Sequence, residues 1–195
     1  MLRGYMERTD ELWSRSIDAI HRAHSLDAEN PECHRLLCEV YLLRRDFEKV
    51  EFHQERALAL NPNDPRLVVQ RGFVLAWVGR GEEGVPWVEK AMRLDPNHPE
   101  AYYSNLGLVR HEARRYREAT EALKRMPAPQ VQQHATMASC YGWMGEDAAA
   151  TAQAAAILAL KPEFTAAAHT ADLPYKNEAD REHHRQGLLK AGLPD

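Results

Sequence analysis

Apolar residues recur along the chain at helical spacing, and short polar turns that contain proline separate the apolar stretches. The clearest turn is LNPNDP at residues 60–65, and related turns at residues 26–31 and 94–99 lie 34 residues to either side. A fixed period of this length is typical of repeat proteins, in which each unit buries its apolar face against a neighbour. The pattern therefore predicts an all-α chain built from antiparallel helix pairs.

Small residues fall at matching places in successive units. With Pro62 and Pro96 at position 32 of a 34-residue unit, position 8 holds Gly72, and position 27 holds Ala57 and Ala91. Small side chains at such places let two helices cross closely. These columns resemble the tetratricopeptide repeat, and the resemblance implies a right-handed solenoid of antiparallel helix pairs, the superhelix of that family.

On this resemblance we expect one tetratricopeptide-repeat domain over residues 1–195. Residues 1–30 are a partial repeat, and residues 31–64, 65–99, 100–130 and 131–162 are full repeats. Residues 163–195 form further helices, the last of which begins after Asn177 and ends before Gly192. We expect this final helix to cap the solenoid, because an uncovered apolar end favours aggregation.

Two irregularities interrupt the pattern. Residues 126–130 (MPAPQ) contain two prolines, so the second helix of the third repeat loses almost a turn. Pro86 lies early in the second helix of the repeat 65–99, where it either kinks that helix or marks a delayed start near Val85.

Composition narrows the choice of partners. The formal net charge is -4 and the two signs are mixed, so no basic stripe favours nucleic acid or an anionic membrane. No apolar run is long enough to span a bilayer. Three cysteines are an odd number and form no disulfide framework. We expect a cytoplasmic protein with no nucleic-acid or membrane partner.

Several short motifs are weak candidates for chemistry. Residues 79–84 spell GxGxxG, but no strand precedes them and two glutamates within them would repel a phosphate. Cys33, His34 and Cys38 lie close together on one helix, and His34 and Cys38 share a face that we expect to be packed rather than to bind a metal.

The remaining histidine motifs also favour structure over chemistry. His111 and Glu112 lack the second histidine of a zinc-protease helix, and Asp180 and His184 have the spacing of a surface pair on one helix. We therefore predict no catalytic, cofactor-binding or metal site, and no enzyme activity.

The tetratricopeptide resemblance implies a concave face lined by fixed positions of each first helix. Apolar and aromatic side chains occupy its centre, with arginines beside them, and such a surface would suit a protein or peptide with apolar anchors. The predicted peptide-binding residues are Arg35, Arg66, Val69, Phe73, Trp77, Leu108 and Trp143. The alternative is that some of these side chains pack against the next helix or the C-terminal segment.

Two other functions stay open. The N-terminal end carries Trp13 and Ile20, through which two chains could form a homodimer. The C-terminal residues, including LPYK at 173–176 and AGLP at 191–194, resemble the end of bacterial class III adenylate/guanylate cyclase-like or transcriptional proteins that carry repeats. That resemblance implies a regulatory or oligomerisation segment of a larger signalling protein.

Overall fold

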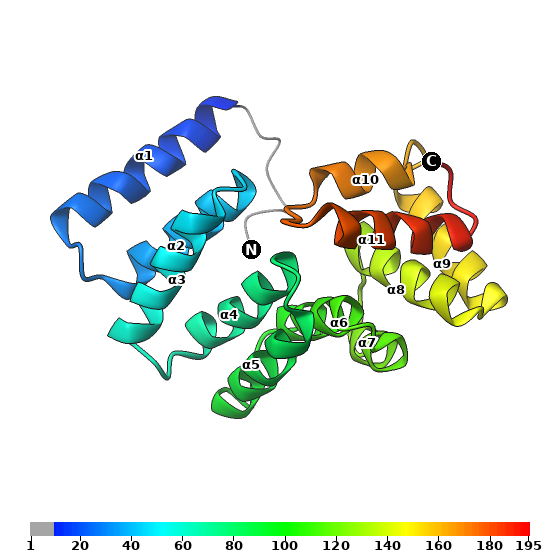
Figure 1. Ribbon diagram of the computed structural model, residues 1–195, viewed down its shortest axis with the longest axis horizontal. Coiled ribbons are helices and arrows are strands. Elements are labelled where there is room, and N and C mark those ends of the chain that lie inside the picture. The colour runs from blue at the N-terminus through cyan, green and yellow to red at the C-terminus, as the bar shows by residue number, and fades with distance from the viewer. Residues whose placement is uncertain (1–9) are drawn as a thin grey trace. The chain divides into compact units, whose positions relative to one another are not determined.

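The computed structural model describes the backbone of residues 10–195 and the side chains from residue 14 onward (Figure 1). Within this part the chain has eleven helices and no strand, which confirms the predicted all-α class. None of these helices combines the length and apolarity needed to cross a membrane. The helices are α1 (Asp10–Leu26), α2 (Pro31–Leu43), α3 (Phe47–Leu60), α4 (Pro65–Trp77), α5 (Gly81–Leu94), α6 (Ala101–Glu112), α7 (Tyr116–Leu123), α8 (Val131–Met144), α9 (Asp147–Leu160), α10 (Ala166–Asp172) and α11 (Glu178–Lys190).

The chain divides into two compact units, and the described residues up to residue 62 form the first. Its α2 begins at Pro31, and the Asn30 side chain before it accepts hydrogen bonds from the backbone N–H groups of the first turn. The cap and the proline both favour a helix start here. Proline fits the first turn because the N–H group that it lacks would have no partner within the helix at that position. His34 and Cys38 are 2% and 0% exposed, so these side chains pack in the core as predicted. The side chain of Trp13 lies outside the described residues.

Residues 63–195 form the second unit, in which α4–α5, α6–α7 and α8–α9 pack as pairs. Glycines let α4 and α5 approach closely: a Cβ on Gly72 would lie 2.8 Å from the carbonyl oxygen of Gly84. We propose that the pairs α2–α3, α4–α5, α6–α7 and α8–α9 correspond, in that order, to the repeats 31–64, 65–99, 100–130 and 131–162.

Both sequence irregularities are visible in the helices. α7 has 8 residues, whereas α5 and α9 have 14 each, as the prolines that follow α7 require. The delayed start near Val85 is wrong, because α5 begins at Gly81 and contains Pro86. The glycine at residue 79 has φ +80°, which ends α4 and lets the chain turn into α5 within a few residues.

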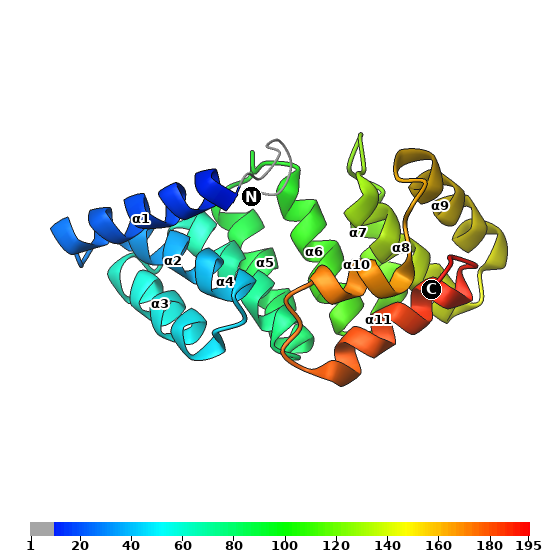
Figure 2. The same cartoon turned by 90° about the horizontal axis from the view of Figure 1, so that it is seen from above.

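The C-terminal helices fold back against the preceding repeats. Figure 2 shows α11 crossing α8, with α10 above it, and these contacts confirm the predicted capping helix. Leu188 and Leu193 are buried in one cluster with Ala138 and Tyr141 of α8. The chain end is held as well, since the backbone N–H of Ala166 donates to the carbonyl oxygen of Pro194 at 2.7 Å.

Replacing Gly72 by leucine tests the close packing of α4 on α5. The side chain would enter space held by Val88 and the backbone of Gly84, so we expect a loss of about 3 kcal/mol or more in the free energy of unfolding. Ala152→Leu, on the exposed side of α9, is the control and is expected to change it by less than about 0.5 kcal/mol. Urea unfolding followed by circular dichroism measures both, and equal midpoints would contradict this packing.

Candidate functional site

Residues 173–190, which we call the tail segment, cover parts of α4, α6 and α8. The segment begins against the end of α4, where the backbone N–H of Lys176 donates to the carbonyl oxygen of Trp77 at 2.9 Å. The ring of Tyr175 meets the Trp77 ring edge-on, with the centroids 4.8 Å apart. Leu173 and Tyr175 are 2% and 6% exposed, so the first residues of the tail segment are buried against the second unit.

Charged and polar groups hold the first turns of α11 beside the α6–α7 turn. The Nη2 atom of Arg114 donates to Oδ1 of Asp180 at 2.9 Å. The hydroxyl of Tyr116 and Nε2 of His183 are 2.7 Å apart, which is a hydrogen-bond distance. The contacts join residues far apart in the sequence, so they fix the position of α11 rather than its helicity.

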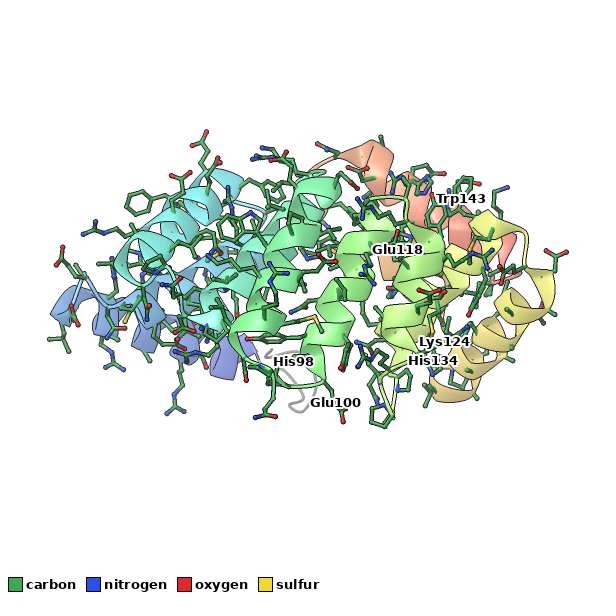
Figure 3. The ribbon with its side chains drawn as sticks, turned by 90° about the horizontal axis from the view of Figure 1, so that it is seen from below. His98, Glu100, Glu118, Lys124, His134 and Trp143 are labelled. Atoms are coloured by element: carbon green, nitrogen blue, oxygen red, sulfur yellow. The ribbon has the colours of Figure 1, made fainter. Side chains whose placement is uncertain are left out.

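Trp143 on α8 makes three contacts with α11, and Figure 3 shows it beside that helix. Its indole N–H donates to the carbonyl oxygen of His183 at 3.1 Å. Its ring also stacks on the His183 imidazole, with centroids 4.2 Å apart and planes within 1° of parallel. The ammonium of Lys190 lies 5.0 Å from the centre of the Trp143 ring, so a cation–π contact is added.

Two glycines allow α8 and α11 to touch backbone to backbone. A Cβ on Gly142 of α8 would collide with the carbonyl oxygen of Gly187, and one on Gly187 would collide with Oγ of Ser139. The helices therefore meet at a distance that only glycine permits at these two positions. This crossing places Trp143 and His184 against each other's helix.

A buried polar cluster lies between α6 and the tail segment, formed by His111, Glu112, Tyr175 and His184. Oε1 of Glu112 accepts a hydrogen bond from the Tyr175 hydroxyl at 2.8 Å, and Nδ1 of His111 lies 2.8 Å from the same oxygen. Nδ1 of His184 lies 2.9 Å from the Tyr175 hydroxyl oxygen. The side chains of His111 and Glu112 are 0% and 1% exposed, and His184 is 0% exposed.

Burial sets the protonation of the cluster. It raises the pKa of the Tyr175 hydroxyl well above its usual range, and the carboxylate of Glu112 adds to this effect. Burial also lowers the pKa of His184 well below the ordinary histidine value, with His111 as the next contributor. Tyr175 is therefore a neutral phenol and His184 a neutral imidazole at pH 7.

The predicted peptide-binding residues of the second unit are mostly covered. Trp77, Val69 and Leu108 are 3%, 6% and 6% exposed. Trp77 and Trp143 contact the tail segment, which is the packing alternative that the sequence left open. Phe73 is half-buried and meets Trp77 edge-on, with the ring centroids 5.8 Å apart.

The two predicted arginines lie in different units and are paired with acids. Arg35, in the first unit, forms salt bridges with Glu32 and Glu39 at 2.7 Å and 2.6 Å. Arg66, in the second, is exposed and pairs with Asp64 at 2.7 Å. A peptide-binding role for all seven residues stays a prediction.

Sequence reasoning missed the histidine in α11. The expected surface pair of Asp180 and His184 is wrong, since His184 is fully buried and Asp180 pairs with Arg114. A usable signal was present: His184, Gly187 and Leu188 share one face of α11, and two of the three are small or apolar. That face predicts a buried histidine.

Comparisons with known proteins identify the fold. No protein-family profile matches the sequence, and no curated protein matches it. The solved structure of PilW, described as a widely conserved type IV pilus biogenesis factor, is 18% identical with a TM-score of 0.70, over 92% of this chain and 82% of that one. YrrB, described as a tetratricopeptide-repeat protein with an unusual peptide-binding site, is 20% identical with a TM-score of 0.57, over 89% and 90%.

A third structure, TTC0263, is a thermophilic tetratricopeptide-repeat protein from Thermus thermophilus. It is 19% identical with a TM-score of 0.62, over 92% of this chain and 94% of that one. At these identities the likeness shows the fold alone, and the fold is that of tetratricopeptide-repeat proteins. The resemblance of the tail to cyclase-like proteins stays a prediction.

Replacing Gly187 by leucine should undock α11. The new side chain would collide with Ser139 and Trp143, so we expect the amide protons of α11 to exchange with solvent roughly tenfold faster or more. Gln186→Leu is the matched control, because residue 186 is half-buried and its side chain bonds Glu182 of the same helix. Hydrogen exchange read by mass spectrometry compares them, and equal exchange in both variants would contradict the docking.

Acid should weaken the docking of the tail segment. Burial, with Arg114 as the second cause, lowers the pKa of His183 from 6.5 to about 4. In a displaced tail His183 takes up a proton below about pH 6.5, whereas in the docked tail it does so only near pH 4. The docked state is therefore fully stabilised above pH 6.5 and loses that stability as the pH falls from 6.5 to about 4. Hydrogen exchange at pH 7 and 4.5, corrected for intrinsic rates, should show α11 losing protection relative to α5. Equal losses in α11 and α5 would contradict this dependence.

Proposed function

We propose that this chain is a non-catalytic protein-binding scaffold, and that the surface covered by the tail segment binds a helix. The observation that carries the proposal is α11 itself, which this surface already holds. Trp143, Arg114 and Tyr116 bind it through stacking, an ion pair and a hydrogen bond. Aromatic and arginine side chains of this kind dominate the energy of protein interfaces.

The polar character of the contact between α11 and this surface supports the idea that a partner helix can displace α11. The outer part of α11 is held by half-buried groups such as His183 and by Asp180, rather than by a continuous apolar seam. Interfaces between separate proteins have the same mixture of a few aromatic anchors and a polar rim. A partner helix with a small residue where Gly187 stands and an acid where Asp180 stands would reproduce these contacts.

The sequence-predicted residues fit this proposal in part. Trp77 and Trp143 contact the two ends of the tail segment, so a helix that replaced it would meet both. Phe73 is half-buried and Arg66 is exposed on α4, and they would extend the interface along α4 toward its first turn. The peptide-binding site ascribed to YrrB supports this reading by analogy of fold.

Binding of the tail in trans tests the proposal. We expect a fluorescent peptide of residues 173–195 to bind the Gly187→Leu chain at least roughly tenfold more tightly than the unaltered chain, whose own tail competes. The control peptide carries Gly187→Leu itself and is expected not to bind, because its side chain cannot enter the crossing. Fluorescence anisotropy measures both.

Trp143→Ala in the Gly187→Leu chain should weaken binding of the peptide, since it removes both the stacking and the indole hydrogen bond. Circular dichroism establishes that each variant keeps its helices. A folded Gly187→Leu chain that fails to bind the peptide, or that binds both peptides equally, would show that the surface is a permanent part of the core.

A further inference from the structure

We propose that His111, Glu112 and His184 form a binding site for a divalent transition-metal ion, Zn²⁺ above others, which joins α6 to α11. The three residues each offer one ligand atom, and these atoms lie within 4.8 Å of one another. Imidazole nitrogens and a carboxylate oxygen are donors that Zn²⁺ takes in proteins. The site lies between α6 and the tail segment, within the contact that a partner helix would replace, but metal binding by the unaltered chain does not depend on that function.

Two buried ligand atoms of the cluster have no hydrogen bond within the described part of the chain, and such atoms favour binding of a cation. The Tyr175 hydroxyl donates to Glu112, so Nδ1–H of His184 donates to the Tyr175 oxygen. This hydrogen bond fixes the tautomer and leaves Nε2 of His184 as a bare lone pair. Neither that atom nor Oε2 of Glu112 has a hydrogen-bond partner among the described residues. The Ala135 carbonyl interacts with the His184 ring and favours its protonated form, so a bound ion would displace this interaction.

The charge of the cluster also favours a cation. Glu112 has a side chain that is 1% exposed, and both Tyr175 and His111 contact the same one of its two oxygens, Oε1. Nη1 of the Arg114 guanidinium is 3.8 Å from Oε2 of Glu112, and the same guanidinium forms a closer ion pair with Asp180. A buried carboxylate oxygen without a hydrogen bond is costly, and a divalent ion bound to Oε2 would remove that cost.

Small side-chain movements bring the donors to metal-binding geometry. Ligand atoms about 2.1 Å from a tetrahedral ion lie about 3.4 Å apart, so the farthest pair must close by roughly 1.4 Å. His111 would also have to exchange one of its hydrogen bonds, to Glu112 or to Ser139, for the bond to the ion. Tyr175 would hold His184 from its other nitrogen, which is the usual outer-shell arrangement of a metal-binding histidine.

The bound ion would link α6 to the tail segment. Since its ligands come from both elements, the ion would bind only while α11 is docked and would stabilise that state. The tail segment would then release more readily in a chelating or acidic environment, because ligand histidines must be unprotonated.

A cobalt titration tests the site. Co²⁺ is the probe because a tetrahedral site gives it visible absorption. We expect the chelator-treated chain to bind one equivalent and Zn²⁺ to displace it. His184→Asn keeps an amide near the Tyr175 hydroxyl but removes Nε2, and Glu112→Gln keeps the shape of the side chain. Each should weaken Co²⁺ binding by roughly 100-fold or more, beyond the loss typical of outer-shell residues. His98→Gln, which removes a histidine from the turn before α6, is the control and should bind as before.

Absence of Co²⁺ binding would overturn the proposal, and so would binding that survives both His184→Asn and Glu112→Gln, which would place the ion on surface histidines. If these variants do not fold, nitrogen-15 spectra of the histidine rings in the unaltered chain decide the matter. We expect Zn²⁺ to shift the ring nitrogens of His111 and His184. Shifts confined to other histidines would contradict the site.

Discussion

The glycine crossing of α8 and α11 is the constraint on which the rest of the second unit depends. Only glycine at residues 142 and 187 lets the two backbones touch. That approach in turn brings His184 to Glu112 and places His183 on Trp143. The buried polar cluster and the stacking depend on this approach, and a methyl group at Gly142 would meet the backbone carbonyl of Gly187.

The tail segment combines two modes of attachment. Its inner side is a core element, with Leu173, Leu188 and Tyr175 buried. Its outer side resembles a protein–protein contact, with an ion pair to Arg114 and a ring stacked on Trp143. A segment attached in this way can cap the repeats and also occupy the surface on which a partner would bind. The proposed metal ion would shift the balance toward capping, because its ligands span both elements.

Much of the fold could be predicted because its signals are local. The proline turns begin α2 and α4 at Pro31 and Pro65, and the short α7 follows from two prolines in sequence. Of the two places that Pro86 allows, the delayed start near Val85 is wrong, because the turn at Gly79, whose positive φ ends the preceding helix, lets α5 begin at Gly81.

The candidate site could not be predicted in the same way. Periodicity places Trp77 and Trp143 at matching positions, yet it says nothing of a distant helix that covers both. His184 looked exposed because its partners, Glu112 and Tyr175, come from other elements. Such contacts depend on how helices separated in sequence meet, and a repeat pattern specifies only neighbouring units.

Hydrogen exchange of the unaltered chain at neutral pH tests the central claim most directly. If the tail segment is docked as described, the amide protons of α11 exchange as slowly as those of α8, against which it packs. Exchange of α11 near the intrinsic rate, with α8 protected, would show that the tail is not held on this surface and would contradict the account.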